Sequence, residues 1–201
     1  RDLHRLIRRQ RQMCIRDSDE VGVEVEDGAI VIDEHCETSV AGIYAIGDVT
    51  GKMQLAHVAS AQGIVAAECA AGQDSTIDYR CVPAAVFTNP EVGNVGLTEP
   101  EAAEAGHQVK TAVFPLQALG RAIALGETAG FAKVVADERT GEVLGVHLVG
   151  PHASDVIAEG ALAIGLEATV SELATTIHAH PTLPEAVMEA ARSWLGQDIH
   201  A

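Results

Sequence analysis

The residues best suited to chemistry lie in one short stretch, HAHPTLPE (residues 178–185). Pro181 lacks a backbone N–H and restricts the residue before it, His180, to extended conformations. Glu185 follows on the next segment, and a carboxylate bonded to one ring nitrogen of a histidine fixes its tautomer and raises the basicity of the other nitrogen. We therefore interpret His180 as a candidate general base and Glu185 as the residue that orients it.

Two other interpretations of this stretch stay open on the residues alone. An isolated His-x-His-Pro sequence is also typical of a surface or interface histidine with a structural role. A metal site formed by His178 and His180 is disfavoured, because residues two apart on an extended segment point to opposite faces, and we predict no metal site. No obvious nucleophile accompanies the His180–Glu185 pair.

A second candidate site follows the apolar run GIYAIGDV (residues 42–49). We predict a buried strand here, which would place the carboxylate of Asp48 at the edge where open α/β sheets bind ligands. A helix is expected to start at the segment formed by Gln54, Leu55, Ala56 and His57. Its first N–H groups and positive dipole end could face an anionic or electron-rich ring. An ordinary turn aspartate before a core helix is the alternative.

The elements that must position the second site are predicted from local patterns. Residues 21–34 alternate apolar and polar side chains around Asp27 and Gly28, which predicts a β-hairpin with its turn at that dipeptide. Residues 54–71 have the composition and apolar spacing of a helix. Residues 78–83 are a predicted linker, so the chain is expected to divide near residue 80.

The elements around the His180 stretch are shorter and more numerous. The expected strands are two within 84–99, broken at Asn89-Pro90, then 108–116, 130–137 and 141–150, the last two forming a hairpin. The expected helices are Thr98–Ala105, a helix over 154–168 with Ser154 as its cap, a short turn from Ser171, and Pro184–Leu195. This order predicts an α+β fold, in which antiparallel strands carry helices packed on one side.

Composition and charge limit the classes of function. Apolar residues make up 47% of 201 residues and aromatic residues 3%, so aliphatic side chains must build the core. The formal net charge of −16 argues against nucleic acid and anionic membranes as partners. The acidic surface is interpreted as a solubility feature, with a salt-adapted source as the alternative. No apolar run reaches the roughly 18 residues that a membrane helix needs.

The first 18 residues differ from the rest, because they contain six arginines and no apolar segment typical of a signal peptide. We expect this leader to be artefactual or disordered, with a basic targeting or nucleic-acid arm as the alternative. The four cysteines, Cys14, Cys36, Cys69 and Cys81, form no close pair. This spacing argues against a structural zinc and a local redox disulfide, and favours idle thiols in a cytoplasmic protein.

The candidate stretches occur in a specific order: TSVAGIYAIGDVTG, LAHVA, VFTNPEVGNVGLTE, GFAKVV, GEVLGVHLVGPHASDVI and HAHPTLPEAV. Over roughly residues 19–192, this order resembles the C-terminal half of the FAD-dependent pyridine nucleotide–disulfide oxidoreductases, and within them most resembles the dihydrolipoamide dehydrogenases. The resemblance implies that residues 19–80 are the end of an FAD/NAD-binding α/β domain. It also implies that residues 81–201 are an α+β interface domain that forms a homodimer.

The resemblance implies roles for the candidate residues. His180 matches the family's catalytic base and Glu185 its orienting partner, and the histidine reaches across the dimer to exchange a proton with a thiol of the redox disulfide. Asp48 matches the aspartate that binds the ribityl and phosphate region of FAD. The family segment that lies beside the pyrimidine ring of the flavin corresponds here to four residues: Gln54, Leu55, Ala56 and His57. The implied reaction converts dihydrolipoamide and NAD to lipoamide and NADH. The larger assembly that the resemblance implies is a 2-oxoacid dehydrogenase complex.

The sequence also departs from the family's pattern. It contains neither a GxGxxG nucleotide loop nor a CxxxxC redox pair, so we expect a fragment that does not complete the reaction alone. Mercuric reductases usually end in a vicinal cysteine pair, which is absent here, and glutathione reductases differ after His-Pro-Thr. A related disulfide reductase, a soluble transhydrogenase and a non-catalytic dimerisation module remain as alternatives.

Overall fold

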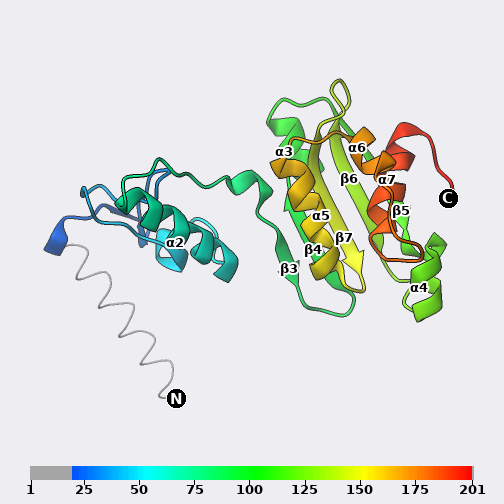
Figure 1. The fold of residues 1–201 in the computed structure, drawn as a ribbon, viewed down its shortest axis with the longest axis horizontal. Coiled ribbons are helices and arrows are strands. Elements are labelled where there is room, and N and C mark those ends of the chain that lie inside the picture. Colours follow the sequence, from blue (N-terminus) through cyan, green and yellow to red (C-terminus); the bar gives the residue numbers. More distant parts are fainter. Residues whose placement is uncertain (1–19, 201) are drawn as a thin grey trace, which may run out of the picture. The chain divides into compact units, whose positions relative to one another are not determined.

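The computed structural model describes residues 20–200 and divides the chain into two compact units, residues 1–77 and 78–201 (Figure 1). The basic leader predicted for residues 1–18 lies outside the described residues. Among the described residues, no helix combines the length and the apolar character needed to cross a membrane.

The first unit begins with the predicted β-hairpin. Strand β1 (Val25–Glu26) pairs antiparallel with β2 (Ala29–Ile30), with Val25 opposite Ile30. The two residues between the strands, Asp27 and Gly28, have φ angles of 49° and 83°. Two successive positive φ values match the twist of a hairpin, which is why Asp-Gly is favoured there. The hairpin prediction is confirmed.

The buried strand predicted for residues 42–49 is wrong. Tyr44 makes only an isolated bridge with Glu37, and the segment ends in a 3₁₀ helix, η1 (Gly47–Thr50). Gly47 has a φ of 76°, which breaks the extended backbone before Asp48. The only sheet described in this unit is the two-stranded hairpin, so no neighbouring strand offers the ladder that an apolar run needs to become a strand.

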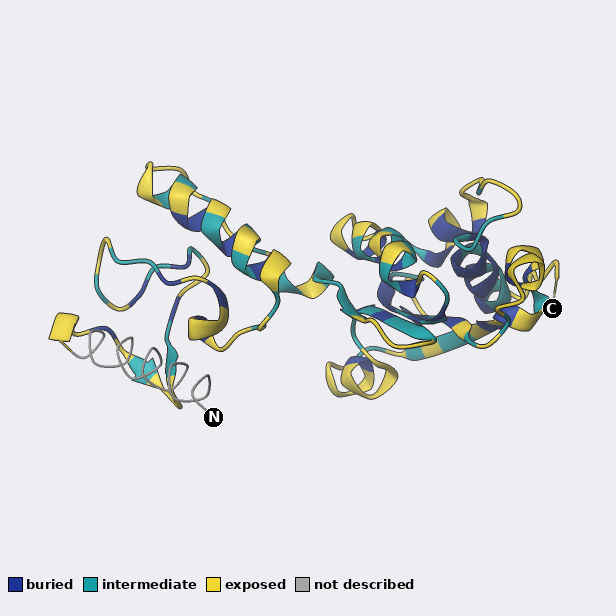
Figure 2. Cartoon of the chain, turned by 90° about the horizontal axis from the view of Figure 1, so that it is seen from below, coloured by how far each residue is buried: buried dark blue, intermediate teal, exposed yellow. Residues whose placement is uncertain are grey.

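Helix α2 (Ala56–Ala70) is the main element of the first unit. It ends as predicted, just before Gly72, whose φ is 86°. Figure 2 shows buried and exposed residues alternating along it. Its inner face meets a small core in which Val65 and Ala66 pack with Ile32, Cys36 and Ala45.

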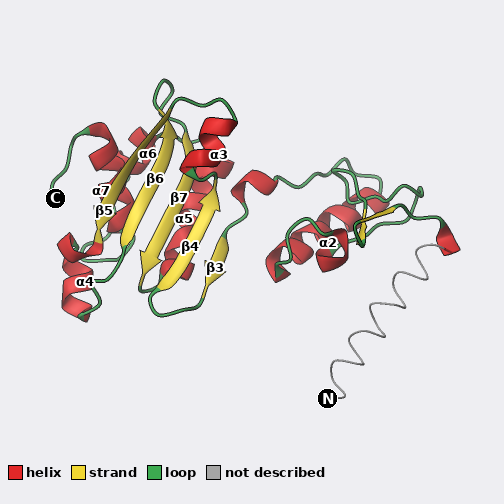
Figure 3. Cartoon of the chain, turned by 180° about the vertical axis from the view of Figure 1, so that it is seen from behind, coloured by secondary structure: helices red, strands yellow, loops and turns green. Residues whose placement is uncertain are grey.

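The second unit contains a five-stranded antiparallel sheet in the order β3-β4-β7-β6-β5 (Figure 3). A short 3₁₀ turn, η2 (Tyr79–Cys81), occupies the predicted linker. The strands are β3 (Ala84–Val86), β4 (Glu91–Gly96), β5 (Val109–Pro115), β6 (Phe131–Asp137) and β7 (Val143–Gly150). The predicted strands and the β6–β7 hairpin are therefore confirmed, as is the α+β class.

The helices of this unit cover the sheet unequally. They are α3 (Glu99–Glu104), η3 (Leu116–Ala118), α4 (Gly120–Leu125), α5 (Ala153–Gly165), α6 (Val170–Thr175) and α7 (Glu185–Leu195). Figure 1 shows α5, α6 and α7 on one face, whereas Figure 3 shows α3 on the opposite face. The expectation that all helices pack on one side is thus wrong for α3, where Ala102 joins Val135 and Leu144 in a separate cluster.

The main core lies between the sheet and the α5–α7 layer. It is mostly aliphatic, as the composition requires, and includes Val134, Val146 and Ile157 together with the fully buried Phe114. Gly160 allows α5 to approach the sheet closely, because a Cβ there would lie 2.8 Å from the Cβ of Val146. Any larger residue at this position would push α5 away from the strands.

The starts of two helices show where local sequence signals succeed and where they fail. The predicted cap at Thr98 is confirmed, since its N–H donates to Glu101 Oε2 at 2.8 Å in a capping box. The predicted cap at Ser154 is wrong: His152 precedes α5, and Glu91 accepts hydrogen bonds from the Ser154 N–H at 3.0 Å and its hydroxyl at 2.7 Å. Glu91 is 63 residues away in sequence, so no local pattern could indicate it.

Candidate functional site

The loop between α6 and α7 carries His180. The helix before it ends at Thr175, and α7 begins at Glu185. The hydroxyl of Thr182 donates to the carbonyl of Ala179 at 2.7 Å, which closes the loop around His180. The His180–Pro181 peptide bond is cis. The side chain of His180 is 70% exposed at the surface of the second unit.

His180 and Glu185 are in direct contact. Nδ1 of His180 lies 2.9 Å from Oε1 of Glu185. Because an ionised carboxylate only accepts hydrogen bonds, Nδ1 donates to it, and in the neutral ring this tautomer leaves the lone pair on Nε2. The structure thus brings together the two residues that the sequence singled out, in the geometry of a base and its orienting group.

Glu185 is itself held in place by the backbone. The N–H of Thr182 donates to its second oxygen, Oε2, at 2.7 Å. Thr182 is not among the residues singled out from the sequence, although Thr-x-x-Glu at the start of a helix is a capping signature. Both carboxylate oxygens therefore have partners, and the buried side chain has one fixed orientation.

The electrostatics of Glu185 favour the ionised form. Burial raises the pKa of its carboxyl group, but the hydrogen bond from the Thr182 N–H, the hydrogen bond and charge of His180, and the charge of His178 outweigh burial, so that the pKa lies below its usual value. Glu185 is therefore a carboxylate at neutral pH, able to stabilise an imidazolium at position 180.

Because of this lowered pKa, the free energy of unfolding should depend on pH. A carboxyl whose folded pKa lies below its unfolded value, about 4.3, stabilises the fold above the unfolded pKa and loses that contribution as pH falls through the folded pKa. We expect Glu185→Gln to lower the free energy of unfolding at pH 7, and the deficit relative to wild type to shrink in acid. Urea unfolding at pH 7 and about pH 3.5 measures it.

A matched control is Met188→Leu in the same helix, where no ionisable group changes and the difference from wild type should not depend on pH. A Glu185→Gln deficit that stays constant or grows on acidification would contradict the assignment.

The second candidate site lies in the first unit. Asp48 is exposed within η1, and Gln54, Ala56 and His57 are exposed around the start of α2, with Leu55 half-buried at the position before its first residue. The N–H of Gly47 donates to Oε1 of the buried Gln62 at 2.6 Å, which fixes η1 on α2.

These residues fit a flavin nucleotide. Leu55, the residue before α2, provides no side-chain cap of its own. The positive end of a helix suits an electron-rich ring edge, and an exposed carboxylate such as Asp48 suits sugar-like hydroxyls. The structure therefore offers FAD two complementary kinds of group in this unit.

Family models match both units. The model described as "Pyridine nucleotide-disulphide oxidoreductase, dimerisation domain" matches residues 82–191. The model described as "Pyridine nucleotide-disulphide oxidoreductase" matches residues 8–63, and so begins within the basic leader.

Curated proteins and solved structures agree with these matches. The dihydrolipoyl dehydrogenase of Halobacterium salinarum is 50% identical over 183 residues, which cover 90% of this chain and 39% of that protein. That of Haloferax volcanii is 52% identical over 92% of this chain and 39% of its own length. LpdA from Mycobacterium tuberculosis superposes with a TM-score of 0.81 at 37% identity, covering 87% of this chain and 39% of that one. The chain thus spans about 39% of these relatives.

Proposed function

This chain belongs to the pyridine nucleotide–disulphide oxidoreductase family, and from that premise we propose that it is the C-terminal part of a dihydrolipoamide dehydrogenase. The proposed reaction oxidises dihydrolipoamide to lipoamide and passes the electrons through a disulfide and FAD to NAD. The observation that carries the proposal is the 2.9 Å hydrogen bond between His180 and Glu185, with the ring exposed at the surface.

His180 is the proposed acid–base group. Its Nε2 takes a proton from a thiol, which makes the sulfur nucleophilic, and later returns the proton to a sulfur that leaves. Glu185 holds the ring in the Nδ1–H tautomer and stabilises the imidazolium that forms. The thiols are supplied by residues and substrate outside this chain.

The proposed FAD contacts lie in the first unit. Bound FAD supplies the two-electron chemistry that links dithiol to NAD. Asp48 would accept hydrogen bonds from the ribityl chain, and the segment from Gln54 through Leu55 and Ala56 to His57 would line the pyrimidine edge of the ring. The positive end of α2, which begins at Ala56, supports this assignment.

We also propose that the protein works as a homodimer through its second unit, and that His180 serves the active site of the other subunit. The match of the dimerisation-domain family model to residues 82–191 supports this. A 2-oxoacid dehydrogenase complex is the proposed larger partner. We propose a cytoplasmic location, since the described cysteines, Cys36, Cys69 and Cys81, are free thiols.

A stand-alone, non-catalytic dimerisation module is disfavoured by the surface of the first unit. Ile46, Val49 and Ile64 are 44%, 36% and 60% exposed. A small unit that functions alone is expected to cover such side chains, whereas part of a larger flavin domain can present them to the remainder of that domain.

The proposal is tested on the full-length protein encoded at the source locus. We expect purified protein to show flavin absorbance and to reduce NAD with dihydrolipoamide, with far lower activity on glutathione disulfide or mercuric ion. If the flavoprotein prefers either of those substrates, the chain is part of a related disulfide reductase instead. Protein without flavin or activity would leave the dimerisation module as the better explanation.

A further inference from the structure

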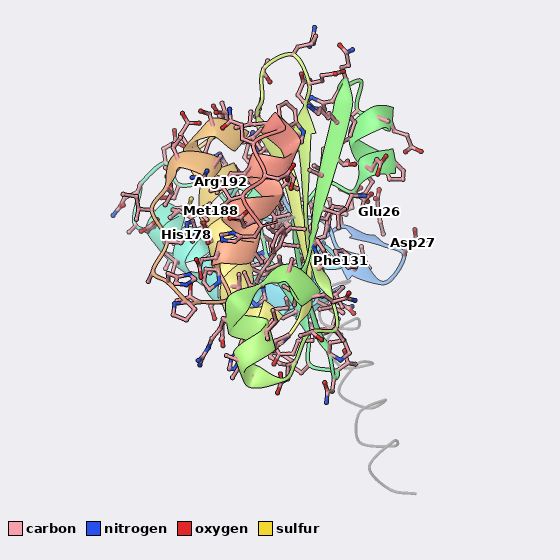
Figure 4. The ribbon with its side chains drawn as sticks, turned by 90° about the vertical axis from the view of Figure 1, so that its right-hand side faces the viewer. Glu26, Asp27, Phe131, His178, Met188 and Arg192 are labelled. Carbon is pink, nitrogen blue, oxygen red and sulfur yellow. The ribbon has the colours of Figure 1, made fainter. Side chains whose placement is uncertain are left out.

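A second histidine lies in the His180 loop and faces inward. The side chain of His178 is 7% exposed, in contrast to 70% for His180. Its Nδ1 lies 2.9 Å from the carbonyl oxygen of Thr176, and its Nε2 lies 2.8 Å from Oε1 of Glu159 on α5. Figure 4 shows His178 beside α7, the helix that begins with Glu185. Both ring nitrogens are therefore used.

The His178–Glu159 contact is a strong one. A carbonyl oxygen can only accept, so Nδ1 of His178 donates to Thr176, and one further proton lies between Nε2 and Oε1 of Glu159. Hydrogen bonds between such groups are charge-assisted and gain strength where water is excluded.

His178 is the residue that faces inward within the otherwise exposed residues 175–181. Of residues 175–181, all of which are described, only His178 is not exposed, and Ile177 beside it is 96% exposed. The run has no regular structure between α6 and α7. The position of the His180 backbone relative to α5 and α7 therefore depends on the bond from His178 to Glu159, 19 residues earlier in the chain.

We propose that His178 and Glu159 are positioning residues that hold the 176–180 segment on α5 and so align the His180 ring with Glu185. The inference rests on the proposed role of His180 as the base. His178 is close enough to Glu185 to affect its pKa. Burial raises the pKa of Glu185, and the hydrogen bonds from Thr182 and His180 lower it. The charge of His178 lowers it further.

Two variants should weaken the contact between His178 and Glu159 to different extents. In His178→Asn, the amide nitrogen can still donate toward the Thr176 carbonyl, but the shorter side chain cannot reach Glu159. In Glu159→Gln, an acceptor oxygen remains while the negative charge is removed. His152→Asn is the matched control, because His152 contacts Asp155 at 3.1 Å in an exposed pair, with side chains 65% and 78% exposed.

The readout is the tautomer of His180, measured by ¹⁵N NMR on the full chain with labelled histidine. We expect wild type and His152→Asn to hold His180 mainly as the Nδ1–H tautomer. His178→Asn should lose that preference, and Glu159→Gln should lose part of it. Unchanged tautomers in both variants would overturn the proposal. If His178→Asn does not fold, Glu159→Gln decides the question, because it keeps the size and the acceptor.

Activity of the full-length protein separates this inference from the proposed reaction. Misplacing a catalytic group by about 1 Å can cost up to about 10²-fold, so His178→Asn should lower kcat with flavin absorbance unchanged. If His180→Gln leaves turnover intact, the proposed base is wrong whatever the NMR shows. If His180→Gln is inactive but the tautomer is insensitive to His178 and Glu159, only the positioning role fails.

Discussion

Replacing His180 with glutamine should lower the thiol–disulfide turnover of the full-length enzyme by about 10²–10⁴-fold, the usual contribution of general acid–base catalysis. Glutamine keeps the approximate size and a donor toward Glu185 but cannot take or return a proton. In the proposed mechanism the lost group is the proton acceptor, which the 2.9 Å bond to Glu185 orients and which is 70% exposed. Steady-state NAD reduction by dihydrolipoamide measures the effect.

Flavin absorbance should be unchanged, because the proposed FAD contacts lie in the other unit. His152→Gln is the control, as its ring is exposed and pairs only weakly with Asp155, and it should retain wild-type turnover. Turnover within a few-fold of wild type in His180→Gln would end the base assignment. Loss of flavin together with activity would contradict the expected result, because the substitution would then have disturbed the fold as well as the proton transfer.

Replacing Phe114 with alanine should lower the free energy of unfolding by about 3–5 kcal/mol, the cost of truncating a buried phenylalanine. Phe114 lies on β5, is 0% exposed and contributes to the main core of the second unit. The core around it is mostly aliphatic. Many of its members are valines and alanines, whose β-branched or short side chains fill little of the cavity that truncation leaves.

Urea unfolding followed by tryptophan fluorescence measures this loss. The chain contains one tryptophan, Trp194, whose indole N–H donates to the Lys110 carbonyl at 2.8 Å, so its signal reports the second unit. Phe87→Ala is the matched control: Phe87 is 81% exposed, and its truncation should change stability by less than about 0.5 kcal/mol. Similar losses in both variants would show that the core around Phe114 is not packed as described.

Much of the fold was predictable because its signals are local. The hairpin at Asp27 and Gly28 follows from the φ angles that these residue types tolerate. Helix α2 and the β6–β7 hairpin follow from periodicity, and the capping box at Thr98 follows from four adjacent residues. In each case the hydrogen-bond partners lie within a few residues or directly across a turn.

Several of the failures share one cause, which is dependence on distant residues. An apolar run such as 42–49 becomes a strand only beside another strand, and none is described next to it. Helix α4 was not predicted, because it is short and begins at Gly120 without a side-chain cap. The start of α5 is capped by Glu91, while Ser154 was the local candidate.

The candidate site divides in the same way. The sequence by itself determined the residue types, the proline that restricts His180, and the five-residue spacing that lets Glu185 reach back to it. The tertiary structure decided which ring is exposed and which is buried: His178 turns inward to Glu159 on α5, whereas His180 stays at the surface. The physical reason is that burial and long-range hydrogen bonds depend on which surfaces pack together, and spacing along the chain does not specify that.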